Sequence, residues 1–185
     1  MKISIYQDRI EWLESDLLVV PVFSDERPLK GFSGRIDWRL NGKISKLILK
    51  QTISGKFGET TIFSPKSKIK VKKLFIVGLG NKDHLTEINL QTAFSWVSKT
   101  IDGLNLQNFS IPLSQFSNHQ LSFERVSRIY LEYFSRPIDS KPFSESIVIV
   151  DNKTELHEVA NHIKRFEQTV SFPIQLEIQE QSTII

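Results

Sequence analysis

Two segments contain the residue types that could hold a phosphate group. Residues 78–81 follow an apolar run at 74–77, and residues 23–34 follow a second apolar run at 17–23. Such runs are typical of buried strands, and ligands of open α/β sheets gather at the carboxyl ends of strands, where backbone N–H groups and cations bind anions. We therefore predict that any small-molecule site lies between these two segments. Its candidate residues are Phe23, Arg27, Lys30, Gly31, Gly34, Gly78, Leu79, Gly80 and Asn81.

The glycine motif at 78–80 does not by itself identify a ligand. A dinucleotide-binding G-x-G-x-x-G would need a third glycine where Asp83 stands, and the Lys–Ser/Thr pair of a P-loop is missing. A Gly-x-Gly after a strand also occurs where the chain only turns with positive φ. A turn and a binding loop are therefore both open interpretations of residues 78–84.

The sequence offers no convincing motif for catalysis or metal binding. His157 and His162 are five residues apart, about 140° around a helix, whereas the zinc-protease helix needs histidines four apart. The chain has no cysteine, and Ser33 lacks the G-x-S-x-G spacing of a nucleophile elbow. We predict no catalytic residue, no metal and no cofactor, and we expect a protein that is not an enzyme.

Positive charge is concentrated in one part of the chain. Residues 27–73 contain thirteen Lys or Arg against Asp37 and Glu59, a net charge of +11, whereas the whole chain carries +3. Five of these cations share one side of a helix predicted at 34–52: Arg35, Arg39, Lys43, Lys46 and Lys50. Lysines at alternate positions from 66 to 72 predict an exposed edge strand or hairpin arm. A solvated face and a nucleic-acid contact are the two interpretations of this charge.

The length of 185 residues suits one domain with one sizeable core. No stretch approaches the roughly 20 apolar residues that span a bilayer, and we recognise no signal peptide at the start. With no cysteine, a disulfide framework is excluded. We expect a soluble, cytoplasmic protein that does not contact membranes.

Strand and helix patterns alternate along the sequence. Apolar runs at 17–23, 74–77, 109–113 and 147–150 predict strands that are covered on both faces, and a last strand is predicted at 174–178. Helical spacing occurs at 34–52, with an interruption at Gly42, and at 86–101, 122–134 and 152–170. This order predicts an α/β fold, a three-layer sandwich with a mainly parallel or mixed central sheet. We expect one domain at residues 1–178 and a frayed tail at 179–185.

Residues 16–137 resemble the N-terminal domain of the leucyl aminopeptidase (cytosol aminopeptidase) family. The resemblance depends on a strand that ends near an acidic loop, G-x7-G at 34–42, GKFGET at 55–60, VGLGNK at 77–82 and RIYLEYFSRPI at 128–138. It implies a macro-domain-like fold. In the family, two metals and the peptidase chemistry belong to a C-terminal domain with an N-T-D-A-E-G-R-L signature, which this sequence does not contain. The resemblance therefore implies no catalytic or metal-binding residue here.

The resemblance implies a non-catalytic macro-like module that acts in assembly, as a homo-oligomer, or as an accessory to a separate peptidase chain. A binder of ADP-ribose or another phosphate-bearing small molecule is the second interpretation. The macro domains that bind ADP-ribose carry an Asn-rich, multi-glycine loop that is absent here. The third interpretation is a nucleic-acid binder that uses the basic face.

Overall fold

The computed structural model describes residues 2–7, 10, 13–66, 69–134, 145–170 and 173–179. Seven described strands form one sheet in the order β3-β4-β2-β5-β6-β1-β7. Their bounds are β1 Lys2–Gln7, β2 Ser15–Phe23, β3 Thr60–Phe63, β4 Val71–Gly80, β5 Asn108–Pro112, β6 Glu145–Val150 and β7 Gln175–Gln179. Only β3 runs antiparallel to its neighbour, β4. The other adjacent pairs are parallel. The sheet is therefore mixed and mainly parallel, as predicted.

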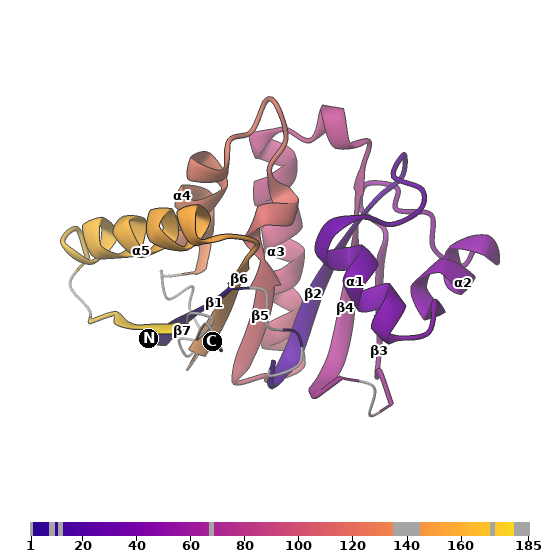
Figure 1. The fold of residues 1–185 in the computed structure, drawn as a ribbon, viewed down its shortest axis with the longest axis horizontal. Coiled ribbons are helices and arrows are strands. Elements are labelled where there is room, and N and C mark those ends of the chain that lie inside the picture. Colours follow the sequence, from indigo (N-terminus) through magenta and orange to yellow (C-terminus); the bar gives the residue numbers. More distant parts are fainter. Residues whose placement is uncertain are drawn as a thin grey trace, which may run out of the picture.

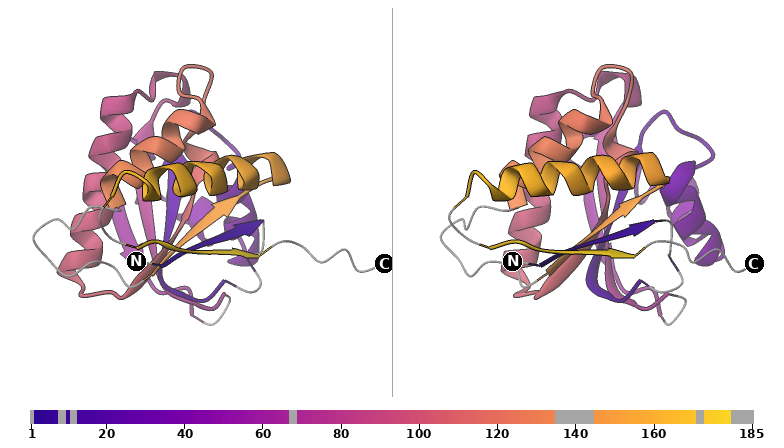
Figure 2. Two further views of the ribbon diagram at one scale, coloured as in Figure 1. Left: turned by 90° about the vertical axis from the view of Figure 1, so that its left-hand side faces the viewer. Right: turned by 60° about the vertical axis from the view of Figure 1, so that its left-hand side comes forward.

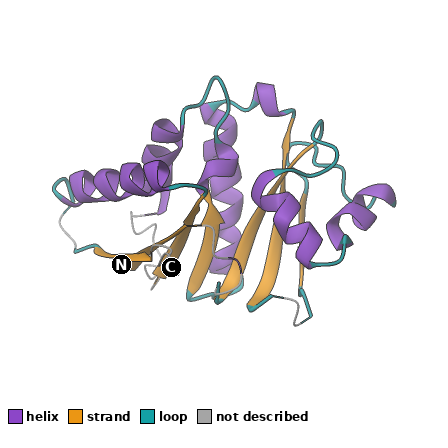
Figure 3. Cartoon of the chain, in the orientation of Figure 1, coloured by secondary structure: helices purple, strands orange, loops and turns teal. Residues whose placement is uncertain are grey.

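Helices cover both faces of this sheet (Figures 1 and 3). One face carries α1 (Gly31–Arg39) and α2 (Lys43–Leu49). The other carries α3 (Glu87–Gly103), α4 (Phe123–Phe134) and α5 (Lys153–Glu167). Two short 3-10 helices, η2 (Lys82–His84) and η3 (Leu113–Phe116), follow β4 and β5. Figure 2 shows the three layers from the side, which confirms the predicted three-layer α/β sandwich. Within the described ranges, no helix is long and apolar enough to cross a bilayer.

The central strand β2 explains why both faces are covered. All nine of its residues are buried. Leu17 and Val19 pack in the core beneath α3, α4 and α5, whereas Leu18 and Val20 pack in the core beneath α1 and α2. Side chains alternate between the two faces of a strand, so an uninterrupted apolar run needs helices on each side.

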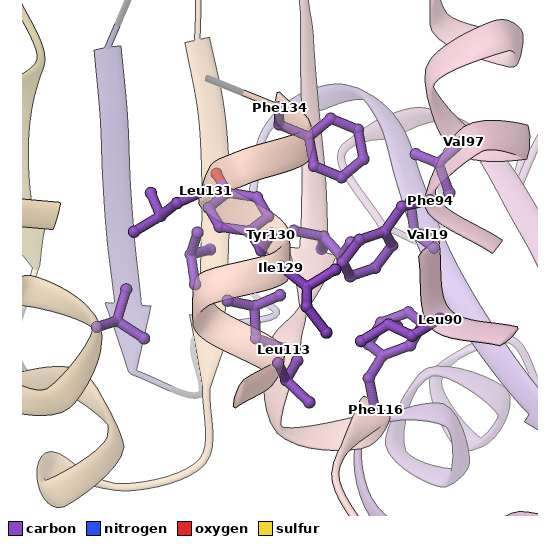
Figure 4. Packing of buried hydrophobic residues seen from close by; sticks show 14 of the residues in the cluster. Val19, Leu90, Phe94, Val97, Leu113, Phe116, Ile129, Tyr130, Leu131 and Phe134 are labelled. Atoms are coloured by element: carbon purple, nitrogen blue, oxygen red, sulfur yellow. The ribbon is translucent and has the colours of Figure 1, made fainter. Parts of the chain in front are cut away.

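Aromatic rings fill the larger core, as Figure 4 shows. The ring centroid of Phe94 lies 5.3 Å from those of both Phe116 and Phe134. Tyr130 is fully buried beside them, and its hydroxyl is hydrogen-bonded to the hydroxyl of Ser146 on β6. This bond ties α4 to the sheet and gives the one polar group of that ring a partner.

Three features differ from the sequence prediction. β4 does not end at Val77 but continues to Gly80, where it pairs with β2 on one side and is hydrogen-bonded to residues 55–59 on the other. The Gly78 N–H donates to the Glu59 carbonyl at 2.7 Å, and the Gly80 N–H donates to the Gly55 carbonyl at 2.9 Å. Strands β1 and β3 were not predicted from residue patterns. The predicted helix at 34–52 starts three residues earlier.

Other expectations are confirmed only in part. The interruption at Gly42 is real: its φ is +70°, and it separates α1 from α2. The edge strand or hairpin arm expected at the lysine-rich segment is not formed by it: Lys66 and Lys70 lie in the connection between β3 and β4, and Lys72 lies on β4, which has β3 on one side and β2 on the other. Lys68 of that segment lies outside the described residues, as do residues 135–138 of the family resemblance. Gln179, predicted as tail, ends β7, and residues 180–185 are also outside the described ranges.

Candidate functional site

The carboxyl ends of β2, β4, β5 and β6 lie at one edge of the sheet because these strands are parallel. Residues 24–30 leave β2 there and lead into α1, while residues 81–86 leave β4 through η2. This edge carries both segments in which a ligand site is predicted. Figure 1 shows these connections at the upper end of the sheet.

The two predicted segments contact one another directly. The Ser24 N–H donates to the Gly80 carbonyl at 2.8 Å, and the Lys82 N–H donates to Asp25 Oδ1 at 3.0 Å. The Lys82 ammonium lies 3.2 Å from Glu26 Oε1 and 5.4 Å from the centroid of the Phe23 ring. These bonds tie the two loops to one another.

Arg27 is engaged by backbone carbonyls. Its guanidinium donates to the carbonyls of Phe23, Glu26 and Ser54 at 2.6, 2.8 and 2.7 Å. These bonds tie the loop after β2 to residues 54–59. In this arrangement Arg27 positions two loops, whereas the sequence suggested a phosphate contact.

The Glu59 carboxylate, part of the GKFGET motif at 55–60, organises the neighbouring loop. Its Oε2 accepts the N–H groups of Ser54 and Gly55, both at 2.7 Å. Gly55 has φ +79°, and a Cβ there would stand 2.8 Å from the Phe23 carbonyl oxygen. An acidic residue four positions after a Ser-Gly pair was the available signal for this turn.

The remaining predicted residues of the β4 end also have structural partners. Leu79 is buried in the larger core. Asn81 caps η2, since its side chain accepts the Asp83 N–H at 2.9 Å. Gly80 has φ +74°, which glycine adopts readily. Ligand binding by these residues stays a prediction.

The other three predicted residues lie apart from these, at the start of α1. Gly31 and Gly34 line a hollow of about 400 Å³ together with Leu29, Arg35, Trp38 and Arg39, and Lys30 is the residue before the helix. A Cβ on Gly34 would stand 2.5 Å from the Leu29 carbonyl oxygen, so glycine allows this close approach. The Arg35 guanidinium donates to Oδ1 of Asp151, the residue directly after β6, at 2.9 Å.

Trp38 lines this hollow and also a second one of about 600 Å³, which shares Gly34 and Arg39 with the first. Its side chain is 77% exposed, although it is among the largest apolar residues of the chain. Asp37, the residue before it, is buried and caps α2. Its Oδ1 accepts the N–H of Ile44 at 2.7 Å and that of Ser45 at 3.1 Å.

The predicted basic stripe lies on two helices. Arg35 and Arg39 belong to α1, Lys43 and Lys46 belong to α2, and Lys50 follows α2. Lys43 lies 4.1 Å from the centroid of the Phe63 ring. Lys46 donates to the Asn41 carbonyl at 3.1 Å. Nucleic-acid binding by these side chains stays a prediction.

The match that identifies the family covers residues 19–135, which is more than half of the chain. It is to the model of the cytosol aminopeptidase family, N-terminal domain. The chain belongs to the cytosol aminopeptidase family. The described residues contain no group of three or more His, Asp or Glu that could hold a metal ion.

The curated relatives that this chain matches are much longer than the chain. A probable cytosol aminopeptidase from Sulfurihydrogenibium sp. is 25% identical over 162 residues, which cover 83% of this chain and 32% of the relative. One from Alkaliphilus oremlandii is 30% identical over 87 residues, 47% of this chain and 17% of the relative. The chain spans a third or less of the length of the first curated relatives it matches.

Solved structures place the cytosol aminopeptidase N-terminal domain among macro-like folds. A tomato leucine aminopeptidase mutant aligns with a TM-score of 0.59 and 14% identity, over 86% of this chain and 35% of that one. The Oceanobacillus iheyensis macrodomain with ADP aligns with a TM-score of 0.70 and 12% identity, over 90% and 92% of the two chains. At these identities the comparison shows a shared fold, and the predicted macro-domain-like fold is confirmed.

Proposed function

We propose that this chain is a non-catalytic module that packs against the peptidase part of a cytosol aminopeptidase and acts in its assembly or as its accessory. Two findings support the choice of partner. The chain belongs to the N-terminal domain of that family, and it spans a third or less of the matched relatives. The rest of such a relative is the natural occupant of an exposed surface on this module.

The exposure of Trp38 is the observation that carries this proposal. Tryptophan is enriched at the energetic centres of protein interfaces. Trp38 lines two hollows of about 400 and 600 Å³, which offer room for side chains of a partner. α2 also exposes an apolar residue, Leu49, at 82%. Cations of α1 and α2 surround this surface, so we expect the contacting face of the peptidase part to be acidic.

Affinity capture with the tagged chain tests this function. We expect extracts of its source cells to yield a polypeptide with a metal-dependent peptidase domain, identified by mass spectrometry. Trp38→Ser should lower the captured amount about tenfold, because loss of an interface tryptophan weakens binding strongly. Ile88→Ser is the matched control, since Ile88 on α3 is 74% exposed and lies outside both hollows. Equal capture by both variants, or no peptidase among the captured proteins, would contradict the proposal.

The absence of intrinsic catalysis needs a separate measurement. The purified chain should not cleave a leucyl anilide when Mn²⁺ or Zn²⁺ is added. Cleavage that depends on the metal and persists through further purification would disprove the non-catalytic role.

A phosphate-bearing small molecule is a second candidate, because the hollow at α1 adjoins the carboxyl end of β2. Gly31 and Gly34 line the hollow, and Lys30 is the residue before α1. A macrodomain solved with ADP shares this fold. Calorimetry with ADP-ribose and ADP tests this function. Saturable heat that decreases in Lys30→Gln would support it, and no heat at millimolar ligand would exclude it.

A further inference from the structure

A smaller hollow lies on the other side of the sheet, where α4 and α5 pack side by side (Figure 2). Its volume is about 250 Å³, and its lining combines an apolar part with several charged groups. The apolar part consists of Leu131, which is buried, and Phe166, which is half-buried. An apolar group of a few carbon atoms could pack there.

Two arginines line the same hollow from different helices. Arg128 belongs to α4 and Arg165 belongs to α5, and both are exposed. Neither makes a hydrogen bond or ion pair within the described ranges, whereas Arg125 of α4 binds both carboxylate oxygens of Glu87. A guanidinium presents a planar fork of donors that matches a carboxylate. The hollow therefore offers two guanidinium groups that could bind a carboxylate.

Two carboxylates and a histidine lie beside the arginines in the lining of the hollow. Glu124 and Glu132 line the hollow one helical turn before and after Arg128. The His162 side chain is only 12% exposed; its Nε2 lies 3.9 Å from Glu124 Oε1, and its buried Nδ1 has no hydrogen-bond partner among the described residues. A buried polar atom without a partner is uncommon in folded proteins. The two carboxylates can receive a cationic donor such as an ammonium group.

We propose that this hollow binds an α-amino acid with an apolar side chain. Its carboxylate would bind Arg128 and Arg165, and its ammonium group would bind one of the two glutamates that lie one helical turn to either side of Arg128. Its side chain would pack on Leu131 and Phe166. A plain organic anion would be repelled by the two glutamates, and a plain amine by the two arginines. A free amino acid and a short peptide share this chemistry, and the site does not depend on the function proposed for α1 and α2.

Calorimetry on the whole chain tests the ligand chemistry. L-leucine should give saturable heat, while 4-methylpentanoate and L-leucinamide should each bind about tenfold more weakly, because each lacks one of the two charges. L-leucyl-L-leucine distinguishes the source: tighter binding than L-leucine indicates peptides, and weaker binding indicates free amino acids. No saturable heat from either zwitterion at about 10 mM would overturn the proposal, as would equal binding of L-leucine, 4-methylpentanoate and L-leucinamide.

Two charge-matched variants locate the binding. Arg165→Gln should weaken L-leucine binding about tenfold, because one guanidinium contact is lost. Lys164→Gln removes the same charge from the adjacent residue of α5, which does not line the hollow, and should leave the affinity within about twofold. Urea unfolding should show unchanged stability for both variants. If Lys164→Gln weakens binding as much as Arg165→Gln, the attraction is diffuse and the site is disproved.

Discussion

A Cβ atom on Gly78 would stand 2.2 Å from the carbonyl oxygen of Lys56. Real Cβ atoms do not approach oxygen so closely, so the backbone of residues 55–59 can pack across β4 only where a glycine stands. The N–H of Gly58 also donates to the Gly78 carbonyl at 3.3 Å. The glycine that first suggested a phosphate loop therefore serves close contact between two backbone segments.

Replacement of this glycine should destabilise the fold. We expect Gly78→Ala to lower the free energy of unfolding by about 1 to 3 kcal/mol, since the clash is with backbone and must displace it. Gly103→Ala, at the end of α3, is the control, because a Cβ atom there would meet no described atom within 4 Å. Alanine there should be neutral or stabilise by up to about 1 kcal/mol. Urea unfolding of both variants measures the difference, and equal effects would refute the explanation.

Arg27 should act on loop order more than on any ligand. Arg27→Gln removes the donor to the carbonyls of Phe23 and Ser54, so the amides of residues 24–30 and 54–59 should exchange with solvent about tenfold faster. Lys30→Gln, at an exposed position of the same loop, should leave these rates unchanged. Hydrogen exchange followed by mass spectrometry reports both. Protection that is equal in the two variants would argue against this role.

The buried cap of α2 should contribute measurably to stability. Asp37→Ala leaves the N–H groups of Ile44 and Ser45 without their acceptor, and α2 has only seven residues. We expect the free energy of unfolding to fall by about 1 to 2 kcal/mol. Asp102→Ala, at an exposed position of α3, should change it by less than about 0.5 kcal/mol. A similar loss in both variants would show that the cap contributes little.

Tyr130 should make the fold sensitive to alkaline pH. Burial raises the pKa of Tyr130 well above its usual range, and the hydrogen bond with Ser146 only partly opposes this. Above about pH 10 the unfolded chain loses the phenol proton while the folded chain keeps it. The unfolded state then binds fewer protons, so stability should fall by up to about 1.4 kcal/mol per pH unit.

Two phenylalanine variants test this dependence. Tyr130→Phe should lose less stability than wild type as the pH rises from about 9 to about 11. At neutral pH it should cost about 1 kcal/mol, because the Ser146 hydroxyl loses its partner. Tyr133→Phe should leave neutral-pH stability unchanged, since the Tyr133 hydroxyl makes no hydrogen bond within the described ranges. Parallel pH curves for wild type and Tyr130→Phe would contradict the assignment.

Local patterns predicted the elements that local forces determine. The uninterrupted apolar run of β2 required two covered faces, and Gly42 interrupted the helical pattern where α1 gives way to α2. The strand β1 was missed although Ile3 and Ile5 alternate with polar residues, a pattern that favours a strand; the pattern is short, and the neighbours of β1 come from residues 145–150 and 175–179. The extension of β4 was missed because the glycines at 78 and 80 suggest a turn, whereas pairing with β2 and with residues 55–59 keeps these residues in the strand. The strand β1 and the extension of β4 both depend on pairing with segments that are distant in the sequence or joined by a loop.

The predicted site depended even more on tertiary contacts. A strand end with glycines and cations is visible in the sequence, but the carbonyls that engage Arg27 are not. The stripe of Arg35 and Arg39 was recognised, yet the exposure of Trp38 between them follows from packing of α1 on the sheet. The hollow with Arg128 and Arg165 joins helices that are separate in the sequence, so no motif could indicate it.

The place of β1 in the sheet has a consequence for how the chain folds during synthesis. β1 is made before the other described strands, but its neighbours are β6 and β7, the last two. The half-sheet β3-β4-β2-β5 can pair once residue 112 has emerged from the ribosome. β1 must stay unpaired through that period, because its partners β6 and β7 have not yet been made. The entropic cost of closing the loop from β1 to β6 is offset only when these contacts form. If translation pauses before β6 has emerged from the ribosome, the half-sheet β3-β4-β2-β5 can be formed while β1 is still unpaired.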